Sequence, residues 1–188
     1  MGKLVVSVFT SLDGYIEPES GFEGPAWSDD LDRNWSGHAL ERARHIVYGR
    51  VNFEFNRDFW SAADTDPDSP AAGISYASTM NGLPKTMFSR TLTGDPGWNG
   101  TIARDIAETI AKLKREVDGD IFAFGGASLS SALIAADVVD EIMIMILPVL
   151  WGGGRRMFEL KHARQELELI ESRQLDTGAM LMRYARSR

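Results

Sequence analysis

The segment from residue 120 to residue 156 constrains the fold more than any other part of the chain. An apolar run, Ile121 to Phe124, ends at the pair Gly125-Gly126, and small residues in a helical pattern continue through Ala136. A second apolar run, Glu141 to Leu147, follows soon afterwards. A strand, a glycine turn and a helix that leads into another strand are typical of a sheet with parallel strands.

The same alternation of strands and helices runs through the rest of the chain. The expected elements are strands at 3–9, 45–48 and 85–88, and helices at 28–44, 74–81 and 101–117. Residues 165–174 and 179–186 alternate in polarity and predict a terminal antiparallel hairpin. The sequence therefore predicts one α/β domain over residues 1–188. It has a doubly wound, mainly parallel sheet, helices on both faces and a C-terminal antiparallel hairpin.

Composition and charge exclude several classes of function. The 188 residues carry a net charge of −7, which argues against nucleic-acid binding because that requires a basic surface. Without cysteine, disulfides and thiolate chemistry are excluded, and the three scattered histidines predict no metal site. No apolar stretch reaches the ~20 residues of a membrane helix, and the N-terminus does not resemble a signal peptide. We therefore expect a cytoplasmic protein with no membrane partner.

Three expected strands end in residues suited to phosphate groups. After the strand at 121–124, the turn Gly125-Gly126-Ala127-Ser128 could cradle a pyrophosphate at a helix start, or it could be a tight turn that Ser128 caps. Ser89-Arg90 could bind a 2′-phosphate, as in a site that prefers NADPH to NADH, or Arg90 could be solvated. Gly49-Arg50 could meet a phosphate, or Arg50 could form a surface ion pair.

Other residues near strand ends have two interpretations as well. Arg155-Arg156 could hold a substrate anion or form an exposed basic corner, and we favour the exposed corner for at least one of them. Asp13 could relay a proton if burial raised its pKa, or it could close an Asx turn. The aromatic side chains that could stack on a flat heterocycle, or fill the core, are Trp27, Trp35, Phe53, Phe55 and Trp60.

The order of these motifs along the chain resembles a known family. The segments are VFTSLDGYI, VYGRVNFEF, KTMFSRTL, DIFAFGGASL and MILPVLWGGGRRMFE. Together they resemble the dihydrofolate reductase-like fold, and most closely the reductase (RibD C-terminal) domain of bacterial riboflavin biosynthesis and its stand-alone relatives. The resemblance extends from about residue 3 to residue 184. It implies an NADPH-dependent reductase that forms a homodimer, with the run Glu141 to Leu150 as a candidate seam.

The resemblance also implies roles for individual residues. Those expected at the cofactor are Val8, Thr10, Gly14, Ile16, Gly49, Arg50, Ser89, Arg90, Gly125, Gly126, Ala127, Ser128 and Leu129. Asp13 and Tyr15 belong to the lid of the same pocket, and the substrate wall is expected at Pro148, Leu150, Trp151 and Gly153. The expected substrate is a small heterocycle or a ribosylamino-pyrimidine.

Two alternatives to this function remain open. One is reduction of dihydrofolate, although no carboxylate among Asp29, Asp30 and Asp32 matches the family's pterin-binding position by motif. The other is a non-catalytic NADP(H)-binding or sensor protein. Deaminase activity is excluded, because the deaminase signature that often accompanies this reductase requires cysteines.

Overall fold

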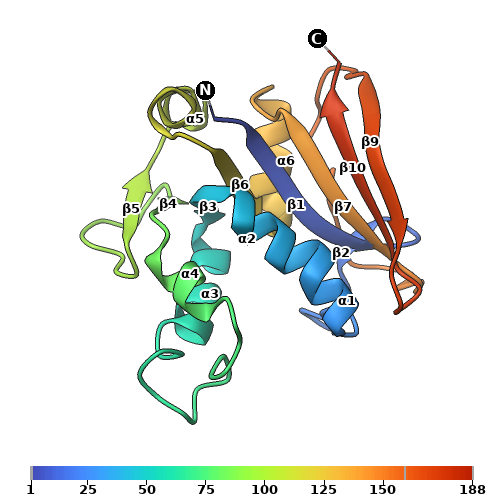
Figure 1. Ribbon diagram of the computed structural model, residues 1–188. Coiled ribbons are helices and arrows are strands. Elements are labelled where there is room, and N and C mark those ends of the chain that lie inside the picture. Colours follow the sequence, from blue (N-terminus) through green and yellow to red (C-terminus); the bar gives the residue numbers. More distant parts are fainter. Residues whose placement is uncertain (1, 159, 188) are drawn as a thin grey trace.

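The computed structural model describes residues 2–158 and 160–187, and its centre is an eight-stranded sheet (Figure 1). The strands lie in the order β5-β4-β3-β6-β1-β7-β10-β9. Their bounds are β1 Leu4–Ser11, β3 Ala43–Gly49, β4 Lys85–Phe88, β5 Gly100–Ala103, β6 Asp120–Phe124, β7 Glu141–Leu147, β9 Leu167–Gln174 and β10 Met180–Arg186. The strands from β5 to β7 are parallel and the last two are antiparallel, as expected.

Helices cover both faces of this sheet, which confirms the predicted fold class. Their bounds are α1 Asp29–Leu31, the π-helix η1 Asp32–Gly37, α2 His38–Arg42, α3 Arg50–Trp60, α4 Ala77–Gly82, α5 Ile106–Glu116 and α6 Ala127–Ala135. Apolar residues of α5 and α6 pack on one face of β1 and β6, and those of η1 and α2 pack on the other. The central strands are buried on both faces, so their sequences are almost continuously apolar.

The segment before α5 differs from the prediction. Residues 101–103 were expected in a helix, but they belong to the edge strand β5, which pairs with β4. The helix begins only at Ile106, because the Asp105 side chain accepts a hydrogen bond from the Glu108 amide at 2.7 Å and caps it. Ser28 caps α1, since its Oγ accepts from the Leu31 amide at 3.1 Å.

A small second sheet joins two segments in which no strand was predicted. Strand β2 (Tyr15–Glu17) pairs with β8 (Arg155–Arg156) in antiparallel fashion. Gly154 has a φ of +126°, and a Cβ there would collide with the Glu17 carbonyl. The pairing brings the loop after β1 against the segment after β7.

Strand β7 is an interior strand of the main sheet. It pairs with β1 on one side and with β10 on the other, and Ile142, Met143 and Met145 are buried within the subunit. The predicted dimer seam through this strand is therefore wrong, because the C-terminal hairpin covers its edge. The homodimer itself stays a prediction.

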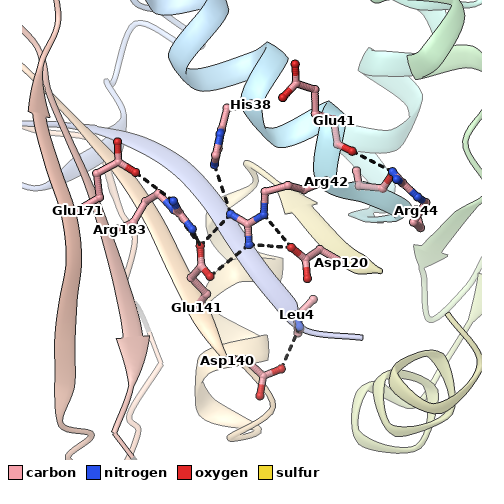
Figure 2. Close-up of polar contacts among 11 residues, drawn as sticks. Leu4, His38, Glu41, Arg42, Arg44, Asp120, Asp140, Glu141, Glu171 and Arg183 are labelled. Carbon is pink, nitrogen blue, oxygen red and sulfur yellow. Dashed lines mark hydrogen bonds and ion pairs between the residues drawn. The ribbon is translucent and has the colours of Figure 1, made fainter. Parts of the chain in front are cut away.

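A network of charged side chains lies at the amino-terminal ends of β6 and β7 (Figure 2). Glu141 is 3% exposed and accepts hydrogen bonds from Arg42 and Arg183 at 2.9 to 3.2 Å. Arg42 also pairs with Asp120, and Arg183 with Glu171. Burial alone would raise the pKa of Glu141, but hydrogen bonds and charge from the two arginines hold that pKa below its ordinary value. The network thus ties helix α2, the sheet and the hairpin together.

Candidate functional site

The three predicted phosphate-binding segments meet at the carboxyl-terminal edge of the parallel sheet. Gly49 pairs in register with Phe88, the residue before Ser89, and Val47 pairs with Ala123. The turns after β3, β4 and β6 therefore emerge side by side. In open α/β sheets this edge is where ligands bind.

The turn after β6 has the geometry that its glycines predict. Gly125 and Gly126 have φ angles of +60° and +78°, a region that favours glycine. The Asn52 amide on α3 donates to the Phe124 carbonyl, and the Gly125 amide donates to the Ser7 carbonyl at 2.9 Å. Asn52 therefore holds the start of α3 against the glycine turn.

No side chain of the described residues caps the start of α6. The alternative in which Ser128 caps its own helix is not what the structure shows, because Ser128 Oγ accepts a hydrogen bond from Arg155 at 2.6 Å. The amides of Ala127, Ser128 and Leu129 belong to the first helical turn, which lacks intrahelical acceptors. Together, these amides and the guanidinium form a positive region suited to an anion.

The two arginines after the second glycine cluster have different surroundings. Arg155 reaches Ser128 and also lies 3.7 Å from Glu17. Arg156 instead lies over the Tyr15 ring, 4.4 Å from its centroid, and donates to the Tyr15 hydroxyl at 3.1 Å. Arg156 thus secures the small sheet, whereas Arg155 faces the start of α6.

Asp13 joins the loop after β1 to the segment after β7. Its carboxylate accepts hydrogen bonds from the Trp151 amide at 3.2 Å and from the Gly152 amide at 2.8 Å. Hydrogen bonds from Ser11 and from these amides lower the pKa of Asp13, although partial desolvation opposes them. A proton relay by Asp13 was conditional on a raised pKa, and these N–H and O–H donors shift the pKa in the other direction.

Two of the predicted phosphate-binding segments are Gly49-Arg50, at the start of α3, and Ser89-Arg90, just after β4. Arg50 forms an ion pair with Glu54 at 2.9 Å, as in the alternative that gave it a surface ion pair. Ser89 is buried, and its Oγ accepts from the Leu92 amide at 3.1 Å. Arg104 donates to the carbonyls of Ser89 and Leu92 and shapes this loop, while Arg90 is exposed.

The residues predicted to form the nicotinamide pocket and the substrate wall lie around the end of β1. Val8, Thr10 and Ile16 are buried, and Val8 and Ile16 belong to the core below the edge. The turn at Gly14 follows, with a φ of +86°. The segment with Pro148, Leu150, Trp151 and Gly153 is held to this loop by the Leu12 amide, which donates to the Val149 carbonyl at 2.9 Å. The buried atoms Ser7 Oγ and Trp151 Nε1 have no hydrogen-bond partner within the described residues.

A cavity that the sequence analysis did not predict lies beside the glycine turn. This aromatic cavity has a volume of about 120 Å³, and its walls include Trp27, Trp35, Tyr48, Asn56, Trp60 and Phe124. Phe124 is the residue before Gly125, and Asn56 lies one helical turn after Asn52. Three tryptophans weighed as stacking residues thus line it, while Phe53 is in the core and Phe55 is 53% exposed. The five aromatic residues noted between 27 and 60 were the sequence feature that could have indicated this cavity.

Among residues 2–158 and 160–187, no cluster of three or more His, Cys, Asp or Glu is arranged to hold a metal ion. No helix in these ranges has both the length and the apolar character needed to cross a bilayer.

Comparisons with known proteins agree with this architecture. The chain is 28% identical over 182 residues to the uncharacterized protein YyaP of Bacillus subtilis (strain 168), covering 97% of this chain and 94% of that protein. A crystal structure from Shewanella sp. PV-4, provisionally assigned to riboflavin biosynthesis, matches with a TM-score of 0.76 and 22% identity, covering all of both chains. Dihydrofolate reductase from Enterococcus faecalis, complexed with NADP(H), matches with a TM-score of 0.63 and 14% identity, covering 100% of this chain and 98% of that one.

The family model described as the RibD C-terminal domain matches residues 2–181, nearly the whole chain. The order of motifs, the parallel sheet with its antiparallel hairpin and this match agree with one another. The protein therefore belongs to the RibD C-terminal domain family, within the dihydrofolate reductase-like fold.

Proposed function

We propose that the protein is an NADPH-dependent reductase of the riboflavin-biosynthesis type, acting as a homodimer on a small heterocyclic or ribosylamino-pyrimidine substrate. The observation that carries this proposal is the convergence of three strand-end turns on the uncapped start of α6, beside Arg155. Amides at a helix start, glycines with positive φ and a nearby guanidinium suit a pyrophosphate. Family membership supports the same class of reaction.

In this proposal, each part of the edge holds one part of the cofactor. The pyrophosphate would lie on residues 125–129 and against Gly49-Arg50. Ser89 and Arg90 would bind the 2′-phosphate, because a guanidinium gives charge and paired donors to a phosphate. Val8, Thr10, Gly14 and Ile16 would form the nicotinamide side. Ser7 pairs with Phe124, the residue before the glycine turn. Its buried hydroxyl has no partner among the described residues and could form a hydrogen bond to the cofactor.

The bound cofactor would supply the hydride, and the chain would align and shield the reacting carbon. The wall formed by Pro148, Leu150, Trp151 and Gly153 is held to the loop after β1 by the Asp13 carboxylate and by strand β2. This attachment would keep water out of the pocket and fix the position of the substrate.

Calorimetry with NADPH, followed by absorbance at the nicotinamide band, tests the proposal. We expect saturable NADPH binding, and NADPH oxidation when a ribosylamino-pyrimidine or another small heterocycle is added. Oxidation with dihydrofolate alone would favour the folate alternative. Binding without turnover of any compound in the panel would favour the sensor alternative, and the absence of NADPH binding would contradict the proposal.

The Asp13→Asn variant separates two roles for that carboxylate. If Asp13 mainly positions the loop, we expect a lower melting temperature and a lower rate, with an unchanged pH-rate profile. The reason is that an amide side chain has only one oxygen to accept the two backbone N–H groups that Asp13 binds. If Asp13 relays a proton, the profile should lose one ionisation. Asp118→Asn, at an exposed aspartate between α5 and β6, is the matched control.

A further inference from the structure

The aromatic cavity borders the end of β6 that carries the glycine turn, and its lining is separate from the predicted substrate wall at 148–153. Phe124 belongs both to its wall and to the strand that ends at the glycine turn. Asn56 in the wall follows Asn52 by one turn of α3, and Asn52 Nδ2 donates to the Phe124 carbonyl. The cavity is therefore connected to the glycine turn through one helix and one strand.

The walls of this cavity are uncharged. Among the described residues that line it, none is lysine or arginine, and tryptophan, tyrosine and phenylalanine predominate. Trp27 is 58% exposed and lies at the mouth, whereas Trp35 and Trp60 are at most 9% exposed. Such walls stack well on a flat ring, but they offer no cation to a phosphate.

The wider hollow next to the cavity is also unfavourable to a phosphate. It has a volume of about 500 Å³ and shares Leu40 and Tyr76 with the aromatic cavity. Its lining includes three carboxylates, Asp29, Asp32 and Glu41, against the single guanidinium of Arg33. A dianionic phosphate monoester that extended from the cavity into this hollow would therefore meet net negative charge.

One polar group in the cavity wall has no partner among the residues that the structure describes. The Tyr48 side chain is fully buried, and its hydroxyl makes no hydrogen bond to any described residue. Burial raises the pKa of this hydroxyl, so it stays neutral and can donate or accept one hydrogen bond. Because a buried unpaired hydroxyl destabilises a protein, its presence among aromatic walls points to a ligand atom that pairs with it.

We infer that the substrate of this protein is an uncharged planar heterocycle of about one ring, without a phosphate, which stacks in the aromatic cavity and pairs with the Tyr48 hydroxyl. A closed cavity of roughly 150 Å³ accepts benzene. This cavity, of about 120 Å³, is smaller but opens beside the exposed Trp27, so one ring can enter it with an edge left at the mouth. The inference rests on the proposed reductase function and narrows its substrate to the phosphate-free class.

Direct binding of matched probes tests this inference. The probes are 5,6-diaminouracil and 5-amino-6-(5-phosphoribosylamino)uracil, titrated by calorimetry, with the fluorescence of the wall tryptophans as a second signal. We expect the free ring to bind at least about tenfold more tightly than the phosphorylated compound, a difference of ~1.4 kcal/mol. Tighter binding of the phosphorylated compound, or no binding of the ring, would overturn the inference.

The Tyr48→Phe variant locates the ring. We expect it to weaken binding of 5,6-diaminouracil about tenfold and to leave NADPH binding unchanged, whereas Tyr184→Phe on β10 should change neither. An unaltered affinity of Tyr48→Phe for the ring would refute the assigned pairing. NADPH is titrated separately, so a protein that bound the ring but not NADPH would retain the cavity assignment while the reductase proposal failed.

Discussion

Replacing Glu141 with Gln is expected to lower the free energy of unfolding by about 3 kcal/mol, because breaking a buried ion pair leaves an uncompensated charge. Glu141 is 3% exposed and is the shared acceptor of Arg42 and Arg183, whose side chains are 22% and 14% exposed. Glutamine keeps the shape of the side chain but neutralises it. Urea unfolding followed by circular dichroism measures the change.

A matched control and the pH dependence make this expectation sharper. Glu116→Gln removes one exposed carboxylate at the end of α5 and should change stability by less than about 0.5 kcal/mol.

The pKa of Glu141 in the folded chain lies below the ordinary value of 4.5. Its stabilisation is therefore present above about pH 4.5 and is lost as the pH falls through the folded-state value. The wild-type chain should consequently lose more stability on acidification than Glu141→Gln, and parallel pH curves would contradict this assignment.

Replacing Arg90 with Ala is expected to weaken NADPH binding about 10- to 100-fold and NADH binding less than about twofold. A charge-assisted hydrogen bond contributes roughly 1.5–3 kcal/mol, and only NADPH carries the 2′-phosphate that would receive it. Arg90 is exposed at the carboxyl-terminal end of β4, beside the buried Ser89. Calorimetric titration of both cofactors measures the two losses.

Arg115→Ala, which removes an exposed guanidinium from α5, is the control for a general change in charge. It should leave both affinities unchanged. Equal losses of NADPH and NADH affinity in Arg90→Ala would assign this arginine a role other than 2′-phosphate recognition.

The best-predicted elements are those that the local residue pattern alone determines, without contacts to distant parts of the chain. The bounds of β4 and β7 match the expected ones, because β7 is apolar from Ile142 to Leu147 and β4 is a short segment between Pro84 and Ser89. Strand β5 was missed because Ile102 continues the helical spacing of Ile106 and Ile110. Its pairing with β4 outweighed that pattern. The pairing of β2 with β8 joins residues about 140 positions apart, which no local pattern encodes.

The candidate site shows the same division between local and distant signals. Gly125 and Gly126 were recognisable, because a turn between a buried strand and a helix needs flexible backbone. The lowered pKa of Asp13 could not be inferred from its neighbours in the sequence, because its donors include the amides of Trp151 and Gly152, which come from a segment after β7. The contact between Arg155 and Ser128, and the unpaired Tyr48 hydroxyl, likewise depend on how distant segments pack.

The charged network and the glycine turn occupy opposite ends of the same strands. Asp120 begins β6 and Phe124 ends it, and Glu141 begins β7, whose last residue is Leu147 (Figure 1). Changes that alter heat tolerance can thus accumulate around Asp120 and Glu141 without touching the residues that would recognise small molecules. In a directed-evolution library, substitutions for thermal endurance and substitutions for a new substrate should combine with little epistasis, since the length of the sheet separates them.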